Sequence, residues 1–433
     1  MNIKITKPIQ GGIIKAIASK SEAHRLLICA ALANDSSFIT CPERSEDIDA
    51  TIRCLSALGA IIQISNDGFQ VSPIDYKALD KDKTFTLDCG ESGATLRFML
   101  PVCGALGVKA DFHMSGRLPS RPLSALYDEM TTHGCILSEQ GVSPLTCTGQ
   151  LQSGTYTLPG NVSSQYISGL LLALPLLPGD SIIQITCTLE SRPYVDMTLE
   201  ALSLFGVKVT EDSQNTFRIP GNQCLRSPDK IKVGGDWSNA AFWLSAGAIK
   251  NHSITCTGID LNTKQGDKAI CGFLERFGAN VGATAPVARS VIYSERSIIV
   301  SPSKLHGIEI DAENTPDLVP ILAAVAAVAE GQTVIKNAGR LRIKESDRLH
   351  TVTEMLTGVG ADVTQTEDGL IISGRKKLTG GVINAHGDHR IAMTAAILSS
   401  VCTNPVEIIG ADAVNKSYPG FFEDFKALGG QCN

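Results

Sequence analysis

Cationic and hydroxyl side chains gather directly in front of apolar, helix-like segments of this 433-residue chain. The stretch IASKSEAHRLLICAALA, residues 17–33, places two serines, a lysine, a histidine and an arginine before a run of alanine and leucine. A serine there is a common N-cap, but a lysine in the first turn, here Lys20, opposes the positive end of the helix dipole. A bound anion would remove this conflict, so the stretch predicts an anion site at Lys20.

Similar groups recur along the chain. Residues 91–97, 163–165 and 388–390 precede other apolar runs, and the stretches SRPL, SRPY, KESDR and KSYPG, which begin at residues 120, 191, 344 and 416, are expected to open more polar helices. Serine, proline and aspartate are ordinary helix-start residues, but capping does not require the repeated arginines and lysines. Helix N-termini offer free N–H groups and arginine grips carboxylates and phosphates through two parallel bonds, so these starts together favour anion binding.

The elements that must position these residues form a repeat. Six helix-like segments end in a glycine and continue into a short apolar run, and the glycines are Gly59, Gly134, Gly206, Gly278, Gly360 and Gly429. A glycine directly after a helix is typical of a left-handed C-terminal cap. A second, more uniformly apolar set of helices is expected to begin near Ser21, Gly93, Ser164, Ser238, Pro316 and His389. The chain therefore predicts six α/β units, each with an enclosed helix, an outer helix and several strands.

Composition narrows the class of protein. With 43% hydrophobic and 19% charged residues, the chain is long enough for two or three globular domains. A net charge of −6 argues against a nucleic-acid or membrane-surface protein. Thirteen scattered cysteines without a C-x-x-C pair favour the reducing cytoplasm rather than a disulfide framework or a zinc site. No signal peptide, membrane span, nucleotide motif or metal motif is recognised, so we expect neither a cofactor nor a metal.

Nine motifs in order along the whole chain carry a resemblance to a known family: SKSEAHR, ESGATLR, SRPL, SSQYISGLL, SRPYVDMT, TPDLVP, KESDR, GDHRIAM and KSYPGF. Together they resemble the 3-phosphoshikimate 1-carboxyvinyltransferase, or EPSP synthase, family of enolpyruvyl transferases. The resemblance implies a two-lobed, inverted α/β barrel-like fold with three repeats per lobe. By counting repeats we expect one lobe at residues 19–233, on the shikimate 3-phosphate side, and the other at 1–18 plus 234–433, completing the phosphoenolpyruvate and catalytic site.

The implied reaction transfers the carboxyvinyl group of phosphoenolpyruvate to the 5-hydroxyl of shikimate 3-phosphate and releases phosphate, by addition and elimination through a tetrahedral intermediate. It belongs to chorismate and aromatic amino-acid biosynthesis. Its chemistry needs one proton delivered to the methylene carbon, one removed from the hydroxyl, and neutralisation of two phosphates and two carboxylates. The resemblance implies a cytoplasmic monomer with these two small-molecule substrates, and glyphosate as an inhibitor.

The resemblance also assigns residues. For shikimate 3-phosphate they are Lys20, Ser21, Arg25, Ser163, Ser164, Gln165, Ser191, Tyr194, Asp317 and Lys344; for phosphoenolpyruvate they are Lys20, Gly93, Arg121, Gln165, Arg348, Arg390 and Lys416. Lys20, Asp317 and Glu345 are the expected catalytic residues, with Asp317 facing the 5-hydroxyl and Glu345 the methylene carbon. Asp388 and His389 are expected to support Arg390. Glu91 and Arg340 stand where other members have asparagine, and a carboxylate at Glu91 needs a cation such as Arg121.

Two alternatives remain open from the residues. UDP-N-acetylglucosamine enolpyruvyl transferase has the same fold and reaction type, but its signature loop carries a cysteine nucleophile that the stretch HMSGRLPSRPL lacks. A non-enzymatic ring of six subdomains, such as a DNA sliding clamp, would need positive charge spread along an inner surface. The cations of this chain cluster instead at the starts of motifs.

Overall fold

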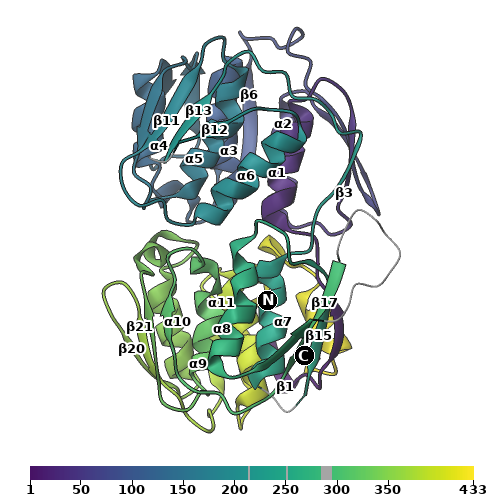
Figure 1. Cartoon of the computed structure of the whole chain (residues 1–433), viewed down its shortest axis with the longest axis vertical. Coiled ribbons are helices and arrows are strands. Elements are labelled where there is room, and N and C mark those ends of the chain that lie inside the picture. The colour runs from purple at the N-terminus through teal and green to yellow at the C-terminus, as the bar shows by residue number, and fades with distance from the viewer. Residues whose placement is uncertain (213–214, 250–251, 284–294) are drawn as a thin grey trace. The chain divides into compact units, whose positions relative to one another are not determined.

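The computed structural model describes residues 1–212, 215–249, 252–283 and 295–433. These residues form two compact units (Figure 1). Unit 1 comprises Met1–Ser19 and Gly234–Asn433, and unit 2 comprises Lys20–Val233. Unit 2 is thus one continuous stretch of chain, whereas unit 1 is assembled from two stretches.

Unit 2 alternates strands and helices throughout. Its elements are α1 (Lys20–Ala31), β3 (Ser37–Thr40), α2 (Glu46–Ala57), β4 (Ile61–Ser65), β5 (Gly68–Ser72), β6 (Thr84–Gly90), α3 (Gly93–Leu106), β7 (Lys109–Met114), η1 (Leu118–Ser120), α4 (Ser124–Thr132), β8 (Cys135–Leu137), β9 (Leu145–Gly149), β10 (Thr155–Leu158), α5 (Ser164–Ala173), η2 (Leu174–Leu176), β11 (Ser181–Ile185), α6 (Arg192–Leu204), β12 (Thr210–Glu211), β13 (Thr216–Ile219) and β14 (Lys230–Lys232), where η marks a 3₁₀ helix.

Unit 1 contains the remaining elements. These are β1 (Asn2–Lys7), β2 (Gly12–Lys15), α7 (Trp237–Ile249), β15 (Ile254–Asp260), η3 (Gly266–Ala269), α8 (Ile270–Phe277), β16 (Asn280–Ala283), β17 (Glu295–Ser301), β18 (Glu309–Asp311), η4 (Pro316–Leu318), α9 (Val319–Ala326), β19 (Gln332–Lys336), η5 (Gly339–Ile343), α10 (Arg348–Gly358), β20 (Asp362–Gln365), β21 (Leu370–Ser373), β22 (Gly381–Asn384), α11 (His389–Leu398), η6 (Ser399–Val401), β23 (Val406–Ile409), η7 (Ala411–Lys416), α12 (Phe421–Ala427) and β24 (Gln431–Cys432).

Six four-stranded sheets, three in each unit, are built from the described residues. Their strand orders are β14-β3-β5-β4, β6-β7-β9-β8 and β10-β11-β13-β12 in unit 2, and β2-β15-β17-β16, β18-β19-β21-β20 and β22-β23-β1-β24 in unit 1. In every sheet the first two strands in this order are parallel and the other pairs antiparallel. The repeated topology confirms the prediction of six α/β units.

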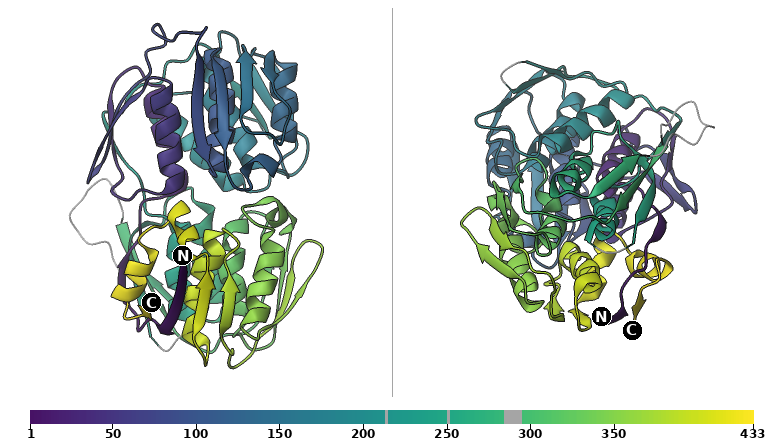
Figure 2. Two further views of the ribbon diagram at one scale, coloured as in Figure 1. Left: turned by 180° about the vertical axis from the view of Figure 1, so that it is seen from behind. Right: turned by 60° about the horizontal axis from the view of Figure 1, so that its bottom comes forward.

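The N-terminal strand β1 completes the last of these sheets. Ile3 faces Ile408 of β23, and Ile5 faces Cys432 of β24 on the other side. Figure 2 shows this strand, in dark purple, beside the yellow strands from the end of the chain. Strand β1 is the third strand in the order of its sheet. In the sheet β18-β19-β21-β20 the third strand, β21, comes instead from the same stretch of chain as its neighbours.

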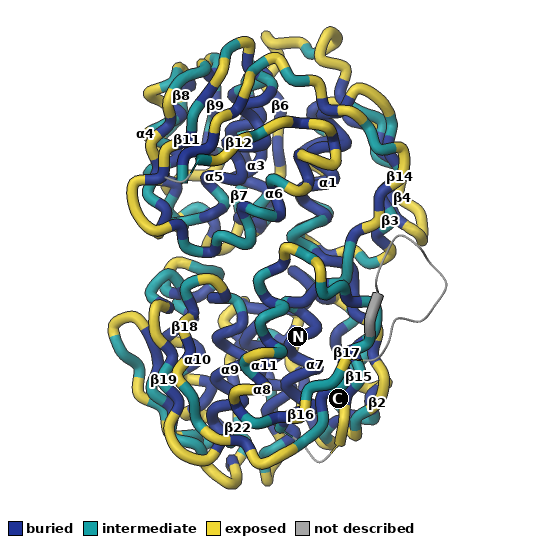
Figure 3. The backbone as a smooth tube through the Cα atoms, in the orientation of Figure 1, coloured by how far each residue is buried: buried dark blue, intermediate teal, exposed yellow. Residues whose placement is uncertain are grey.

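Two kinds of helix pack on these sheets, as the apolar pattern predicts. Helices α3, α5, α7, α9 and α11 are buried along almost their whole length, and Figure 3 shows them largely in dark blue. Helices α2, α4, α6, α8, α10 and α12 instead keep an exposed side. The six repeat glycines all have positive φ, between 76° and 101°, which confirms their predicted role after a helix.

Three expected helix starts are wrong in detail. Ser120 ends the short helix η1 and Lys416 ends η7, so α4 and α12 begin only at Ser124 and Phe421. Lys344 follows η5, and α10 begins at Arg348. In SRPL and KSYPG a proline intervenes, and the residue before a proline is disfavoured in the helical region. Among the described residues, no helix is both long and apolar enough to cross a membrane.

Candidate functional site

Lys20 is the first residue of α1, and its ammonium reaches the start of the next helix. Its Nζ lies 2.7 Å from Oδ2 of Asp47, and both side chains are largely buried. Asp47 lies in the first turn of α2, where a carboxylate is favoured by the helix dipole. The carboxylate therefore relieves part of the conflict that a lysine creates at a helix start. Asp47 lies outside the nine motifs, so it was not predicted from the sequence as a partner of Lys20.

Gly93 opens α3 at a point where two guanidinium groups converge. A methyl group in place of its hydrogen would lie 2.5 Å from Nη1 of Arg97 and 2.8 Å from Nη1 of Arg121. Arg97 is buried and donates to the carbonyl of Gly93 at 3.3 Å and to Oε1 of Gln165 at 3.1 Å. The structure thus brings Gly93, Arg121 and Gln165 together around Arg97. Arg97 is the last residue of the motif ESGATLR, a signal that should have placed it among the candidates.

Arg25 is buried on α1 and is held by neutral oxygens. It donates from Nε to the Thr198 hydroxyl at 2.7 Å, from Nη1 to the Ser21 carbonyl at 2.6 Å and from Nη2 to the Tyr194 carbonyl at 2.8 Å. Burial lowers its pKa to about 10, still far above neutral pH. These bonds orient the cation without cancelling its charge, so the charge remains available to an anion.

Hydroxyl groups line the starts of α5 and α6. Ser163 is the N-cap of α5, and its Oγ accepts from the Gln165 N–H at 3.3 Å; Ser164 behind it is buried. Ser191 is buried directly before α6 and has a φ of 53°. A left-handed conformation is uncommon for serine and costs free energy, and such residues cluster at functional sites. Tyr194 lies one turn further, with its N–H bonded to the Ser191 carbonyl.

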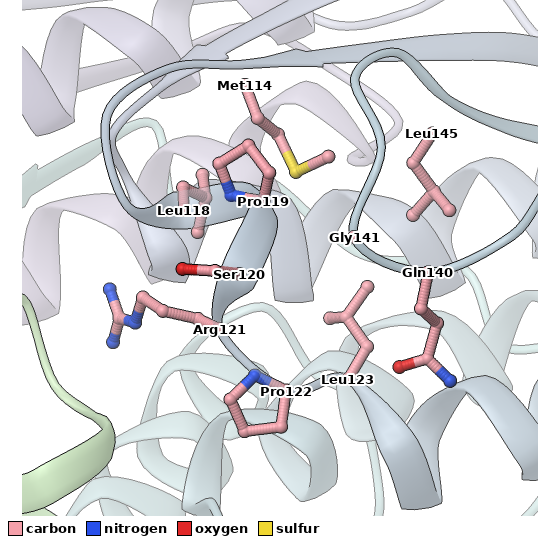
Figure 4. A pocket seen from close by; sticks show the side chains of 10 residues that line it. All are labelled: Met114, Leu118, Pro119, Ser120, Arg121, Pro122, Leu123, Gln140, Gly141 and Leu145. Atoms are coloured by element: carbon pink, nitrogen blue, oxygen red, sulfur yellow. The ribbon is translucent and has the colours of Figure 1, made fainter.

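The segment that carries Arg121 also lines a small hollow of about 170 Å³. Its wall consists of Met114, Leu118, Pro119, Ser120, Arg121, Pro122 and Leu123, with Gln140, Gly141 and Leu145 opposite. Figure 4 shows the Arg121 guanidinium pointing away from Gln140 and Leu123. The hollow is therefore mainly apolar, and the cationic end of Arg121 belongs to the region around Gly93.

In unit 1 the predicted residues meet around Arg348, which opens α10 and is 1% exposed. Its guanidinium lies 2.7 Å from Asp388, 2.8 Å from Asp317 and 2.6 Å from Glu345. Asp388 is completely buried as the N-cap of α11 and accepts from the Arg390 N–H at 3.0 Å. Four predicted residues, together with the supporting Asp388, therefore form one network.

The carboxylate of Asp317 is surrounded by three cations of this network. Arg390 contacts it at 3.3 Å and Lys344 at 3.5 Å, in addition to Arg348. Burial by itself would raise the pKa of Asp317, but Arg390, Lys344 and Arg348 together hold it well below the usual value. Asp317 is consequently ionised at neutral pH, so it can accept a proton or hydrogen bond but has none to donate.

Lys416 joins the same region from the end of η7. Its side chain is buried, and Nζ donates to the carbonyl of Gly387 at 2.7 Å, directly before the N-cap of α11. Arg340, the other unusual position, donates to the carbonyl of Glu313 at 2.9 Å. The pairing of Glu91 with Arg121 stays a prediction.

Comparisons with known proteins agree with this architecture. Residues 3–425 match the family model of EPSP synthase (3-phosphoshikimate 1-carboxyvinyltransferase). The 3-phosphoshikimate 1-carboxyvinyltransferase of Clostridium kluyveri is 45% identical, over 98% of this chain and 96% of that protein. The enzyme of the same name from Clostridium acetobutylicum is 44% identical, over 100% and 98%.

Solved structures extend the comparison to the fold. EPSP synthase from Acinetobacter baumannii has a TM-score of 0.82 at 26% identity and covers 100% of this chain and 99% of that chain. The enolpyruvyl transferase NikO from Streptomyces tendae has a TM-score of 0.77 at 18% identity, over 100% and 98%. At that identity NikO shows a common fold and no more.

Proposed function

We infer the activity of this chain from one premise: the chain belongs to the EPSP synthase (3-phosphoshikimate 1-carboxyvinyltransferase) family, which it matches over residues 3–425. It transfers the carboxyvinyl group of phosphoenolpyruvate to the 5-hydroxyl of shikimate 3-phosphate, giving 5-enolpyruvylshikimate 3-phosphate and phosphate. The reaction serves chorismate and aromatic amino-acid biosynthesis. The UDP-N-acetylglucosamine alternative is not favoured, since the matched relatives are shikimate enzymes.

The observation that supports this function most directly is the charge arrangement in unit 2. Arg25 is buried among neutral acceptors, and Arg97 and Arg121 converge on a helix start that has no side chain at Gly93. Buried cations next to free helix N–H groups are suited to phosphate and carboxylate oxygens. Both substrates carry both kinds of group.

We propose a role for each predicted residue on this basis. Shikimate 3-phosphate is bound by Lys20, Ser21, Arg25, Ser163, Ser164, Gln165, Ser191, Tyr194, Asp317 and Lys344, so that unit 2 supplies most of its contacts. Phosphoenolpyruvate is bound by Lys20, Gly93, Arg121, Gln165, Arg348, Arg390 and Lys416. Lys20 serves both substrates and, with Asp317 and Glu345, is catalytic.

The proposed reaction needs two proton transfers, which we assign to two residues of unit 1. In the addition step the 5-hydroxyl oxygen bonds to C2 of phosphoenolpyruvate, the hydroxyl loses its proton, and C3 gains one. We assign the hydroxyl to Asp317 by the resemblance: its ionised carboxylate can accept the hydroxyl hydrogen, and the three cations that lower its pKa also make it a weak base. Glu345 is assigned to C3 by the resemblance. It must carry a proton, in place of its ion pair with Arg348, when the addition begins; it gives this proton to C3 and takes one back from C3 as phosphate leaves.

We further propose that the enzyme works as a cytoplasmic monomer and that glyphosate inhibits it. All thirteen cysteines are free thiols in the structure, which supports a reducing compartment. Glyphosate carries a phosphonate and a carboxylate, and it would occupy the phosphoenolpyruvate position beside Gly93.

Phosphate release with defined substrates tests the activity. The purified protein should release phosphate from phosphoenolpyruvate in the presence of shikimate 3-phosphate and none with UDP-N-acetylglucosamine. Glu345→Gln should retain binding of shikimate 3-phosphate, measured by isothermal titration calorimetry, while turnover falls by about 100-fold or more. Turnover with the nucleotide sugar alone would overturn the proposal, and loss of binding in a folded Glu345→Gln variant would overturn the role of Glu345.

A further inference from the structure

Two adjacent residues of α1 are buried against different neighbours. Arg25 bonds to Thr198 of α6 and, more weakly at 3.5 Å, to Ser168 of α5. His24, 1% exposed, bonds instead to Thr51 of α2, and both α1 residues pack on Phe98 of α3. Helix α1 is thereby fixed on one side to the helix starts assigned to shikimate 3-phosphate and on the other to the start of α3.

A continuous chain of hydrogen bonds runs from His24 to the first turn of α3. Nδ1 of His24 lies 2.7 Å from the Thr51 hydroxyl, which lies 2.7 Å from the Thr95 hydroxyl. Thr95 in turn lies 2.7 Å from the hydroxyl of Ser92, the N-cap of α3. All four side chains are buried. The chain ends next to Gly93, where Arg97 and Arg121 converge.

The direction of these bonds defines the state of the imidazole. Thr95 donates its single hydroxyl hydrogen to Ser92, so the bond between Thr51 and Thr95 uses the hydrogen of Thr51. Thr51 must therefore accept a hydrogen from Nδ1 of His24. Nε2 of His24 has no hydrogen-bond partner, which suits an imidazole protonated at Nδ1 alone. Burial, with Lys20 and Arg25 nearby, holds the pKa of His24 well below its usual value.

The chain also touches the counter-ion of Lys20. The Thr95 hydroxyl lies 3.4 Å from the backbone carbonyl of Asp47, the residue whose carboxylate holds Lys20. Because the single hydrogen of Thr95 goes to Ser92, the Asp47 carbonyl is a neighbour of the chain and not a second acceptor. The chain thus lies beside the residue that pairs with Lys20 and ends beside Gly93. Hydrogen bonds in a buried chain strengthen one another, so the bonded hydroxyls and Nδ1 of His24 fix the relative position of the helices they join.

We propose that His24 is a positioning residue for phosphoenolpyruvate, acting through Thr51, Thr95 and Ser92 to set the start of α3 against Lys20 on α1. The proposal rests on the proposed function for the identity of the ligand. The neighbouring chain from Arg25 through Thr198 to Ser168, with Thr198 and Ser168 2.8 Å apart, does the corresponding work for shikimate 3-phosphate. Adjacent positions of one helix therefore control different substrates.

A matched pair of variants tests this separation. Thr95→Val and Thr198→Val each replace a fully buried hydroxyl of unit 2 by a methyl group of similar size. Thr95→Val should raise the KM for phosphoenolpyruvate and the inhibition constant of glyphosate about fivefold or more, the worth of a buried hydrogen bond, with little change in the KM for shikimate 3-phosphate. Thr198→Val should do the reverse.

Controls separate positioning from general loss of stability. Thr333→Val removes a buried hydroxyl of β19 in unit 1, which accepts from the Ile308 N–H at 3.3 Å, and should change neither KM. Thr95→Ser restores the hydroxyl and should restore the KM for phosphoenolpyruvate. Equal effects of Thr95→Val on both substrates, or no effect on either, would overturn the proposal.

Two measurements do not depend on turnover. The ¹⁵N chemical shifts of His24 should show an imidazole protonated at Nδ1 and unchanged from pH 8 to about pH 6; protonation at Nε2 would contradict the deduced chain. Amide hydrogen exchange should quicken at the start of α3, but not of α5, in His24→Gln and Thr95→Val. If the wild-type protein had no shikimate activity while these two results held, the proposed function would fail and the structural chain would stand.

Discussion

The two units have the same repeated architecture but treat their buried charges differently. In unit 2 the guanidinium of Arg25 is held by hydroxyl and carbonyl oxygens. In unit 1 the guanidinium of Arg348 is surrounded by the carboxylates of Asp317, Glu345 and Asp388. A neutral acceptor orients a cation and leaves its charge in place, whereas a carboxylate cancels it.

This difference shows how one fold serves two tasks. In unit 2 the hydrogen bonds of Arg25 go to neutral oxygens, an arrangement that suits the proposed binding of an anionic substrate. Unit 1 instead keeps Asp317 ionised by surrounding it with three cations, so this carboxylate can accept a hydrogen bond but has a low affinity for a proton. The topology of the repeat thus fixes where helix starts lie, and the residues at those starts decide between binding and proton transfer.

The largest expected effect tests the binding role of unit 2. Lys20→Ala should lower kcat/KM by about 1,000-fold or more, because in the proposed site the ammonium would make several charge-assisted bonds to the substrates, worth about 1.5–3 kcal/mol each. The free energy of unfolding should change by only about 1 kcal/mol, because the Asp47 side chain, 14% exposed, keeps some contact with water when its partner is removed. Steady-state kinetics and chemical denaturation measure both quantities. Lys77→Ala, at an exposed position of the same unit, should change neither, and a near-normal Lys20→Ala enzyme would remove Lys20 from the site.

A second substitution tests the compensated charges of unit 1. Arg348→Ala leaves buried carboxylates without their main partner and should destabilise the protein by about 3–5 kcal/mol. Denaturant unfolding, with hydrogen exchange to locate the loss in unit 1, measures the effect. Arg375→Ala, which breaks an exposed pair with Asp362 at 3.7 Å, should cost about 1 kcal/mol or less. Equal small losses in the two variants would mean that the Arg348 network contributes no more than a surface ion pair.

The smallest effect distinguishes the units by their response to mild acid. The pKa of His24 in unit 2 is lowered from 6.5 by burial, so below about pH 6.5 the unfolded chain binds a proton that the folded chain does not, and unit 2 loses stability. Burial and the nearby Asp317 raise the pKa of Asp267 in unit 1 to about 6. Its folded form therefore binds the extra proton as the pH falls from about 6 towards 4, and unit 1 gains stability.

Hydrogen exchange, corrected for intrinsic rates, gives the free energy of unfolding of each unit. Between about pH 6.5 and pH 5 this free energy should fall for unit 2 and rise for unit 1, each by on the order of 1 kcal/mol. His24→Gln should flatten the slope of unit 2 alone, and Asp267→Asn that of unit 1 alone. Parallel slopes in the two units would contradict the assignment of these groups.

The fold and the motif residues can be predicted from the sequence to the extent that their causes are local. Gly206 follows a helix because a left-handed residue is needed there, and Ser163 and Asp388 cap the helices that follow them. The partners that hold the site residues are not local. Arg25 and Thr198 are 173 positions apart, and Arg348 and Asp388 are 40 apart.

Such pairs leave no periodic pattern, which is why Asp47 and Thr198 were missed although the residues they hold were predicted. The late starts of α4 and α12 were missed for a related reason. The stretches SRPL and KSYPG carry helix-start residue types, but a short 3₁₀ helix and a non-helical connection precede each real start.

The placement of β1 between β23 and β24 has a consequence for the order of assembly on the ribosome. Unit 2 is one continuous stretch that can close all its sheets once residue 233 has left the exit tunnel. Strand β1 is translated before all the other strands described here, yet its two hydrogen-bonding neighbours are made more than 400 residues later. Domains of a nascent chain fold as they emerge, so unit 1, which contains β1, completes its sheets after unit 2 although its first strand is made earlier.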